Sequence, residues 1–128
     1  SARVRYIGYV KDIEDGYRAA DFTILASKYE PFGLVGVESA MCGTPVILPA
    51  SVGCCDAIAP HAKFVFAAGD VADLRATLER AVRGRLTIQQ SQPRWQSELA
   101  RDAVLYDTSV AGHADALLAL ATHIRGAN

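Results

Sequence analysis

The sequence predicts an α/β fold, in which a parallel sheet of about four strands is flanked by helices. Short runs rich in β-branched and aromatic residues alternate along the chain with stretches of helical periodicity. The run FTILA at 22–26 is typical of a strand that is buried on both faces of such a sheet. A length of 128 residues suits a single domain that spans 1–128.

The first expected elements lie before residue 27. The segment RVRYIGY at 3–9 predicts a strand at 4–8. Asp12 is then expected to cap a helix that has Ile13 and Tyr17 on its buried face. The strand at 22–26 follows this helix.

The middle of the chain repeats the alternation. A mostly apolar helix is expected at 34–42, because Gly43 suits a left-handed C-terminal cap and Pro45 prevents its continuation. Strands are expected at 46–48 and 64–66. Together with the first elements, this order predicts a Rossmann-like sheet with right-handed crossovers.

The last third is expected to be helical around one loop. Asp70 is predicted to cap a helix, and residues 84–93 are polar and predicted to form a loop. Further helices are expected at 94–106 and 110–124. The buried stripe of the helix after Asp70 is expected to consist of Leu74, Leu78, Ala81 and Val82.

Composition excludes several classes of function. Thirteen Lys and Arg against 14 Asp and Glu give a net charge of −1, so nothing global points to nucleic acid. No apolar run approaches the roughly 20 residues that span a bilayer, and no secretion signal is visible. The three cysteines, Cys42, Cys54 and Cys55, indicate reduced cytosolic thiols, with a reactive pair at 54–55 as the alternative.

A candidate ligand site lies where the second expected strand ends. Ligands of open α/β sheets bind outside the carboxyl ends of the strands. Gly33 would let a ligand approach the backbone, and the amides of Leu34 and Val35 would be donors at a helix N-terminus, which favours phosphate. Glu38, about one turn into the helix, is suited to the cis-diol of a ribose. Glu30 is suited to further hydroxyls, so the pattern fits a nucleotide-sugar.

A structural interpretation of the same two acids stays open. Glutamates near a helix N-terminus are stabilised by the helix dipole whether or not a ligand binds. An acid beside a diphosphate also repels it unless basic groups neutralise the phosphates. Lys28 is the nearest base in the sequence, and it is not expected to take that role.

The segment EPFGLVGVE, from Glu30 to Glu38, resembles the E-x7-E element of retaining GT-B glycosyltransferases, the "glycosyl transferases group 1" family, which is similar to glycogen synthase and sucrose synthase. The resemblance covers about 3–83, whereas 84–128 resembles the C-terminal helices of the family only loosely. It is carried by VRYIGYV at 4–10, YRAADFTILASKYEPFGLVGVESAMCGTPVI at 17–47, VGCCDAI at 52–58 and GDVADL at 69–74.

The resemblance implies that the chain is part of the C-terminal, donor-binding domain of a GT-B fold. Glu30 would be the catalytic residue, in contact with hydroxyls of the donor sugar, and Glu38 would hold the ribose. Transfer would retain the anomeric configuration, with neither a metal nor another cofactor. The remaining donor-binding residues would be Gly8, Tyr9 and Val10 beside the base, and Phe32, Gly33, Leu34 and Val35 beside the sugar and diphosphate. Phe32 either lines the donor site or anchors the loop.

The resemblance also implies partners and a location. The donor would be a nucleotide-diphosphate sugar, and the acceptor a sugar or a lipid-linked molecule. The protein would be cytoplasmic. A peripheral position at the inner face of the plasma membrane is the alternative. Arginines at 75, 80, 83, 85, 94 and 101 are either a solvated helical surface or a contact with anionic lipid.

The sequence departs from the family pattern in two respects. Two strands, a loop with an Arg and a Lys that neutralise the diphosphate, and the N-terminal acceptor domain have no counterpart, so the chain alone is expected to be inactive and to bind donor weakly. The strand at 4–8 is then expected to move beside 22–26, with dimerisation through an exposed sheet edge as the alternative. The second departure is Cys54-Cys55, where the family more usually has glycine and other small residues. It puts the fit of the adjacent loop around the donor in doubt.

Two other functions remain open at this stage. The first is a non-catalytic GT-B-derived module that binds a phosphorylated ligand or packs against a partner. The second is a GT-B sugar-nucleotide epimerase, which shares the fold but matches the context of the E-x7-E element less well.

Overall fold

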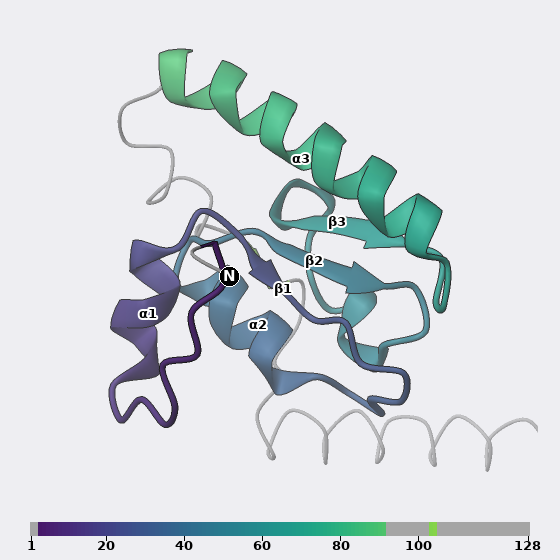
Figure 1. Cartoon of the computed structure of the whole chain (residues 1–128), viewed down its shortest axis with the longest axis horizontal. Coiled ribbons are helices and arrows are strands. Elements are labelled where there is room, and N and C mark those ends of the chain that lie inside the picture. Colours follow the sequence, from purple (N-terminus) through teal and green to yellow (C-terminus); the bar gives the residue numbers. More distant parts are fainter. Residues whose placement is uncertain (1–2, 92–102, 105–128) are drawn as a thin grey trace, which may run out of the picture.

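The computed structural model describes residues 3–91 and 103–104 (Figure 1). Within them a small parallel sheet lies between helices. The elements in chain order are α1 (Ile13–Ala19), β1 (Thr23–Ile24), α2 (Leu34–Met41), β2 (Val46–Pro49), the 3-10 turns η1 (Gly53–Cys55) and η2 (Pro60–Ala62), β3 (Lys63–Phe66) and α3 (Val71–Ser91).

The sheet has the order β1-β2-β3, and both pairs of strands are parallel. Thr23 is opposite Val46, and Ile47 is opposite Phe64. All four residues of β2 are buried, because this central strand has a neighbour on each edge and helices on both faces. The predicted Rossmann-like parallel α/β sheet is confirmed.

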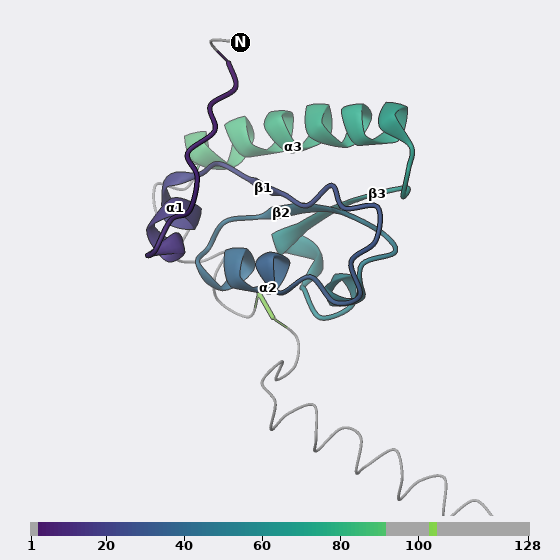
Figure 2. The ribbon, with the colours of Figure 1, turned by 60° about the horizontal axis from the view of Figure 1, so that its bottom comes forward.

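Helices cover the two faces of the sheet separately. Figure 2 shows α3 along one face and α2 on the other, with the sheet between them. On the α3 side, Ile47 and Phe66 pack with Ala81, and the rings of Phe22 and Phe64 meet edge to face at 5.9 Å. The core on the α2 side consists of Val37, Ala40, Val46, Leu48, Val52, Cys54, Ile58, Ala62 and Ala103.

Helix α2 begins and ends at left-handed glycines. Gly33, its N-terminal cap residue, has φ 82°, and Gly43 beyond its end has φ 81°. Both conformations favour glycine because a Cβ would crowd the backbone. The predicted helix at 34–42 and its C-terminal glycine are therefore confirmed.

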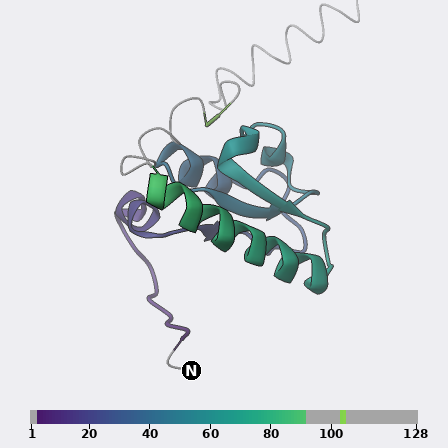
Figure 3. The ribbon, with the colours of Figure 1, turned by 90° about the horizontal axis from the view of Figure 1, so that it is seen from above.

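The predicted strand at 4–8 is wrong. Residues 4–10 form no strand, and Figures 2 and 3 show this segment running away from the sheet. Val4 is 78% exposed and Tyr6 is 95% exposed. Strand propensity is realised only where a partner supplies hydrogen bonds, and no strand of the described sheet pairs with this segment. The described sheet thus has three strands instead of about four.

Two expectations about the strand at 22–26 are also wrong. Only Thr23–Ile24 form β1, and Ile24 is 49% exposed, so the strand is not buried on both faces. The segment at 4–8 does not lie beside it, because the described sheet pairs β1 with β2 alone. Strand β1 is an edge strand in this part of the chain, with one row of backbone groups facing away from the sheet.

Helix α3 is longer than predicted. Its N-terminus is as expected, because the amide of Asp73 donates to Oδ1 of Asp70 at 2.9 Å. The helix continues to Ser91, so the predicted loop at 84–93 is wrong up to that residue. This region holds one glycine among good helix formers, and the proline comes only at position 93.

The buried stripe of α3 differs from the prediction at one position. Val82 is 50% exposed, whereas Thr77 is fully buried beside Leu74, Leu78 and Ala81. None of the described helices combines the length and apolar character that crossing a membrane requires.

The predicted helix at 110–124 lies outside the described residues, as does most of the one at 94–106. Near the end of the latter, Val104 forms an antiparallel bridge with Ile58, so the prediction of helix is wrong there. The amide of Ala59 also donates to the carbonyl of Ala103 at 2.8 Å. This short piece of chain adds to the core on the α2 side.

Replacement of Gly36 should test the close packing of α2. A Cβ at this position would lie 2.9 Å from Cys54 Sγ and 3.3 Å from Ile58 Cδ1. Gly36→Ala should therefore lower the free energy of unfolding by about 1–3 kcal/mol in urea titrations. Gly84→Ala in α3 is the matched control, since nothing lies within 4 Å of its Cβ, and should raise it by about 0.5–1 kcal/mol. Equal effects would contradict this account of the packing.

Candidate functional site

The loop before α2 is held by the segment that follows β2. The amide of Gly53 donates to the carbonyl of Pro31 at 3.1 Å, and the amide of Cys54 donates to that of Phe32 at 2.7 Å. A Cβ on Gly53 would lie 2.4 Å from the Pro31 oxygen, so only glycine permits this approach. The main chain leading to α2 is thus fixed at the carboxyl ends of β1 and β2.

Glu30 lies at the N-terminus of α2. Its Oε1 accepts a hydrogen bond from the amide of Gly33 at 3.1 Å, and the residue is half-buried. The carboxylate therefore satisfies one amide at the positive end of the helix dipole. The amides of Leu34 and Val35 follow in the first helical turn, where an α-helix has no acceptor of its own to offer. Their side chains are 58% and 40% exposed.

Glu38 lies one turn further along α2 and contacts α1. Its Oε2 accepts a hydrogen bond from the hydroxyl of Tyr17 at 3.0 Å, while the residue as a whole is exposed. The two acids of the motif are therefore arranged differently: Glu30 folds back on the helix start, and Glu38 reaches toward the neighbouring helix. Each keeps a carboxylate oxygen that no contact described here engages.

Tyr17 was expected only as a core residue of α1, and its hydroxyl is the contact that sequence reasoning missed. The side chain is 7% exposed. Burial, reinforced by the hydrogen bond and the charge of Glu38, raises the pKa of Tyr17 from 10.0 to about 12. The hydroxyl is consequently a neutral donor at any physiological pH.

A buried polar network connects Tyr17 to the end of α2. Thr44 Oγ1 donates to the carbonyl of Tyr17 at 2.5 Å. Ser39 Oγ lies 2.8 Å from both the Thr44 carbonyl oxygen and Thr23 Oγ1. No buried side-chain nitrogen or oxygen in the described residues lacks a partner. The network therefore carries no unsatisfied polar atom and holds α1 against α2.

Gly33 and Phe32 have structural roles in the loop. A Cβ on Gly33 would lie 2.7 Å from Val52 Cγ1 and 3.0 Å from Leu25 Cδ2, in addition to its left-handed φ. Phe32 is half-buried against the core on the α2 side. This packing is what an anchor for the loop requires, and the role of Phe32 in lining the donor site stays a prediction.

The predicted base-binding residues lie elsewhere. Gly8, Tyr9 and Val10 belong to the segment before α1, where Tyr9 is 91% exposed. Figures 1 and 2 draw this segment beside α1 and not beside the loop that precedes α2. The structure thus brings Glu30, Phe32, Gly33, Leu34, Val35 and Glu38 to one helix, and leaves 8–10 apart from them.

Cys54 is a packing residue beneath the first turns of α2. It is fully buried, and a Cβ built on Gly33 would lie 3.3 Å from its Sγ. Burial, followed by the charge of Cys55, raises the pKa of Cys54 to about 11, so the thiol is protonated at neutral pH. All three cysteines are free thiols in the structure.

Lys63 is a basic residue at the segment that holds the loop, and the sequence analysis did not single it out. Its Nζ donates to the carbonyl of Cys55, and the side chain is half-buried. It follows the buried Ala62 at the start of β3, so only the tertiary structure brings it to this segment. In the described part of the chain, no three His, Cys, Asp or Glu side chains cluster as a metal site requires.

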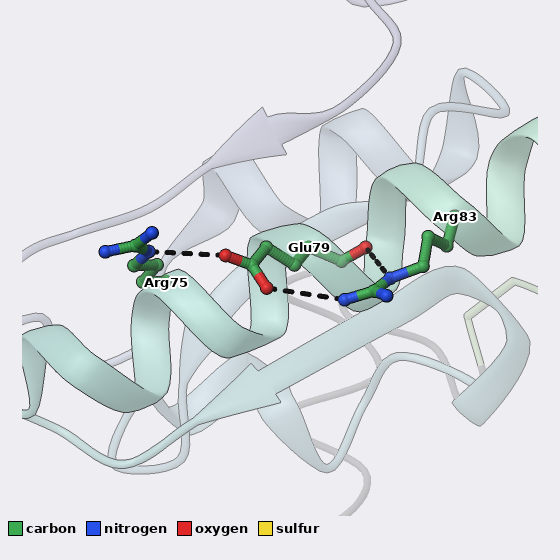
Figure 4. Close-up of polar contacts among 3 residues, drawn as sticks. All are labelled: Arg75, Glu79 and Arg83. Carbon is green, nitrogen blue, oxygen red and sulfur yellow. Dashed lines mark hydrogen bonds and ion pairs between the residues drawn. The ribbon is translucent and has the colours of Figure 1, made fainter.

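Two arginines of α3 contact an acid of the same helix. Figure 4 shows Glu79 between Arg75, at 3.2 Å, and Arg83, at 3.3 Å. All three side chains are at least half exposed, so these ion pairs contribute little stability. They favour the interpretation of this surface as a solvated helical face. Arg94 and Arg101 lie outside the described residues.

Comparison with known proteins identifies the family. The model of "Glycosyl transferases group 1" matches residues 1–98. The chain belongs to this family. A probable transglycosylase of Burkholderia thailandensis is 67% identical over 122 residues, which are 94% of this chain and 33% of that protein. A D-inositol 3-phosphate glycosyltransferase of Frankia alni is 40% identical over 89 residues, 69% of this chain and 20% of that protein.

Solved structures support the fold of this glycosyl transferases group 1 chain. Sucrose-phosphate synthase from Thermosynechococcus elongatus superimposes with a TM-score of 0.68 at 24% identity, over all of this chain and 32% of that one. The catalytic domain of starch synthase IV from Arabidopsis thaliana, bound to ADP and acarbose, gives 0.61 at 23% identity, over 84% of this chain and 23% of that one. The chain spans a third or less of the length of these proteins.

Alkylation should distinguish Cys54 from the other two thiols. In native protein at pH 8, iodoacetamide should modify Cys42 and Cys55 well before Cys54, because Cys54 is buried and protonated. Peptide mass spectrometry over a time course measures this order, and the same reaction in guanidinium chloride should remove it. Early modification of Cys54 in the native state would revive the hypothesis of a reactive pair.

Stability at high pH should report the hydroxyl of Tyr17. A pKa that is raised on folding contributes stability that is complete below pH 10 and is lost as the pH rises through about 12. The free energy of unfolding of the wild type should therefore fall more steeply over this interval than that of Tyr17→Phe. Urea titrations at stepped pH measure the difference. Parallel curves would show that the hydroxyl is not shielded as the structure indicates.

Proposed function

We propose that this chain is the donor-binding part of a retaining glycosyltransferase, which moves a sugar from a nucleotide-diphosphate sugar to a sugar or a lipid-linked acceptor. The observation that carries the proposal is the position of Glu30, whose carboxylate accepts a hydrogen bond from the amide of Gly33, the N-cap residue of α2. This end of the helix favours an anion, and the acid beside it can accept hydrogen bonds from hydroxyl groups. A sugar phosphate presents both groups side by side.

The charges of the site suggest how the diphosphate leaves. As the glycosidic bond breaks, negative charge develops on the diphosphate oxygen, and amides that already point to it stabilise this charge without rearrangement. The amides of Leu34 and Val35 would supply such donors. In this proposal the helix terminus takes the place of a divalent cation. Glu30 would displace its bond to Gly33 and hold a hydroxyl of the sugar.

Glu38 would bind the ribose. Its carboxylate lies one turn along α2 from the phosphate-binding amides and is exposed. Since both acids repel the diphosphate, basic groups from the rest of a longer protein would be required for tight binding and turnover. The chain alone is therefore expected to bind a donor only in the millimolar range, and to be inactive.

Titration of the chain with donors tests the proposal. In ¹⁵N NMR spectra, one of UDP-glucose, GDP-mannose or ADP-glucose should shift the amides between Gly33 and Gly36 with millimolar affinity. Glu30→Gln should weaken the binding of that nucleotide-sugar about tenfold, the size of one hydrogen bond. Binding of the corresponding nucleoside diphosphate should not weaken, because the substitution removes a charge that repels it. The amide oxygen of the substituted side chain still accepts from Gly33, so the fold is retained.

Glu14→Gln on the exposed face of α1 is the matched control and should bind like the wild type. Micromolar binding by the wild-type chain would contradict the need for outside basic groups. Unchanged binding of the nucleotide-sugar by Glu30→Gln would reduce Glu30 to a helix cap, and favour a packing module without catalysis.

A further inference from the structure

The carboxylate of Glu38 is held by a residue that no ligand would touch. Glu38 stands on the exposed side of α2, where a glutamate normally samples several rotamers. The hydroxyl of Tyr17 fixes Oε2 at 3.0 Å. Because only one oxygen is engaged, Oε1 keeps its full capacity to accept hydrogen bonds.

Tyr17 is itself held by its surroundings. The residue is 7% exposed, and its carbonyl accepts a hydrogen bond from Thr44 Oγ1. Thr44 is joined in turn to Ser39, the residue after Glu38, through the Thr44 carbonyl and through the Thr44 amide, which donates to the Ser39 carbonyl at 3.0 Å. A closed ring of contacts therefore runs from Tyr17 through α2 and back to Tyr17.

The chemistry of a tyrosine suits this role. A lysine or arginine in its place would neutralise the carboxylate and compete with incoming hydroxyls for its oxygens. A neutral phenol donates one hydrogen bond and leaves the negative charge on Glu38. Burial keeps that phenol protonated, since its pKa is raised to about 12.

We propose that Tyr17 is a positioning residue, which holds Glu38 so that its second oxygen meets the cis-diol of the donor ribose. This inference rests on the proposed function, because it requires that Glu38 binds ribose. It assigns Tyr17 no contact with the ligand. Its effect is to spare the ligand the cost of ordering the glutamate.

Ribose-dependent binding tests the inference. NMR titrations compare UDP, GDP and ADP with their 2′,3′-dideoxy counterparts, which lack the hydroxyls that Glu38 would bind. The wild-type chain should prefer the ribose form of the base that binds by about tenfold. Tyr17→Phe should reduce this preference to about threefold or less, and Glu38→Gln should do the same. The affinity for the dideoxy form should be equal in the wild type and in Tyr17→Phe, and no lower in Glu38→Gln, which loses a charge that repels the diphosphate.

Tyr6→Phe, at a tyrosine that is 95% exposed, is the matched control and should keep the wild-type preference. If Tyr17 had only a structural role, Tyr17→Phe would weaken the binding of the ribose and the dideoxy nucleotide together. The ratio of the two affinities would then stay unchanged. A Tyr17→Phe protein that keeps the full preference, while Glu38→Gln loses it, would overturn the inference and leave the proposed function intact. Absence of any preference in the wild type, or its persistence in Glu38→Gln, would overturn both.

A measurement on the wild type covers the case in which Tyr17→Phe does not fold. With ¹³Cζ-labelled tyrosine, the Tyr17 signal should shift when the ribose nucleotide binds, because the carboxylate that accepts its hydrogen bond then also accepts hydrogen bonds from the ribose. It should not shift with the dideoxy form. Equal responses to both ligands would overturn the inference.

Discussion

The close contact between the first turns of α2 and the segment from Val52 to Cys54 is the constraint on which the rest depends. Main-chain hydrogen bonds of 2.7 and 3.1 Å join this segment to Phe32 and Pro31, just before α2, and the positions of Gly33 and Gly36 leave no room for a Cβ. This contact sets where α2 starts. It consequently sets where the amides, Glu30 and, one turn later, Glu38 stand relative to the carboxyl ends of the strands.

Much of the fold could be predicted because its signals are local. Gly43 and Asp70 mark helix ends through their own conformation or side chain, and the structure confirms both. The segment at 4–8 could not be predicted in the same way. Its residues have strand propensity, but strand formation needs a partner edge, and propensity says nothing about whether that edge is available. The prediction of where α3 ends was wrong for a related reason, because polar composition alone does not stop a helix.

The site was predictable to a similar extent. The spacing of Glu30 and Glu38 around an apolar helix start predicted that both acids lie at the start of the same helix, and the structure places them there. The hydrogen-bond partners of these two acids lie at very different distances along the chain. Glu30 contacts an amide three residues away, whereas Tyr17 and Glu38 are 21 residues apart. Only helical periodicity, which turned Tyr17 inward, hinted at the second contact. Nothing in the sequence indicated that Lys63 contacts the carbonyl of Cys55.

The coupling of α1 to α2 has a mechanical consequence. Because the hydroxyl of Tyr17 is hydrogen-bonded to Glu38 of α2 and its carbonyl to Thr44 beyond α2, we expect the two helices to move together. A rotation of α2 toward a bound molecule would carry α1 with it. The bending would then fall on the connections that flank α1, before Asp12 and around Asp21, and the exposed stretch at 3–10 would swing as a lever.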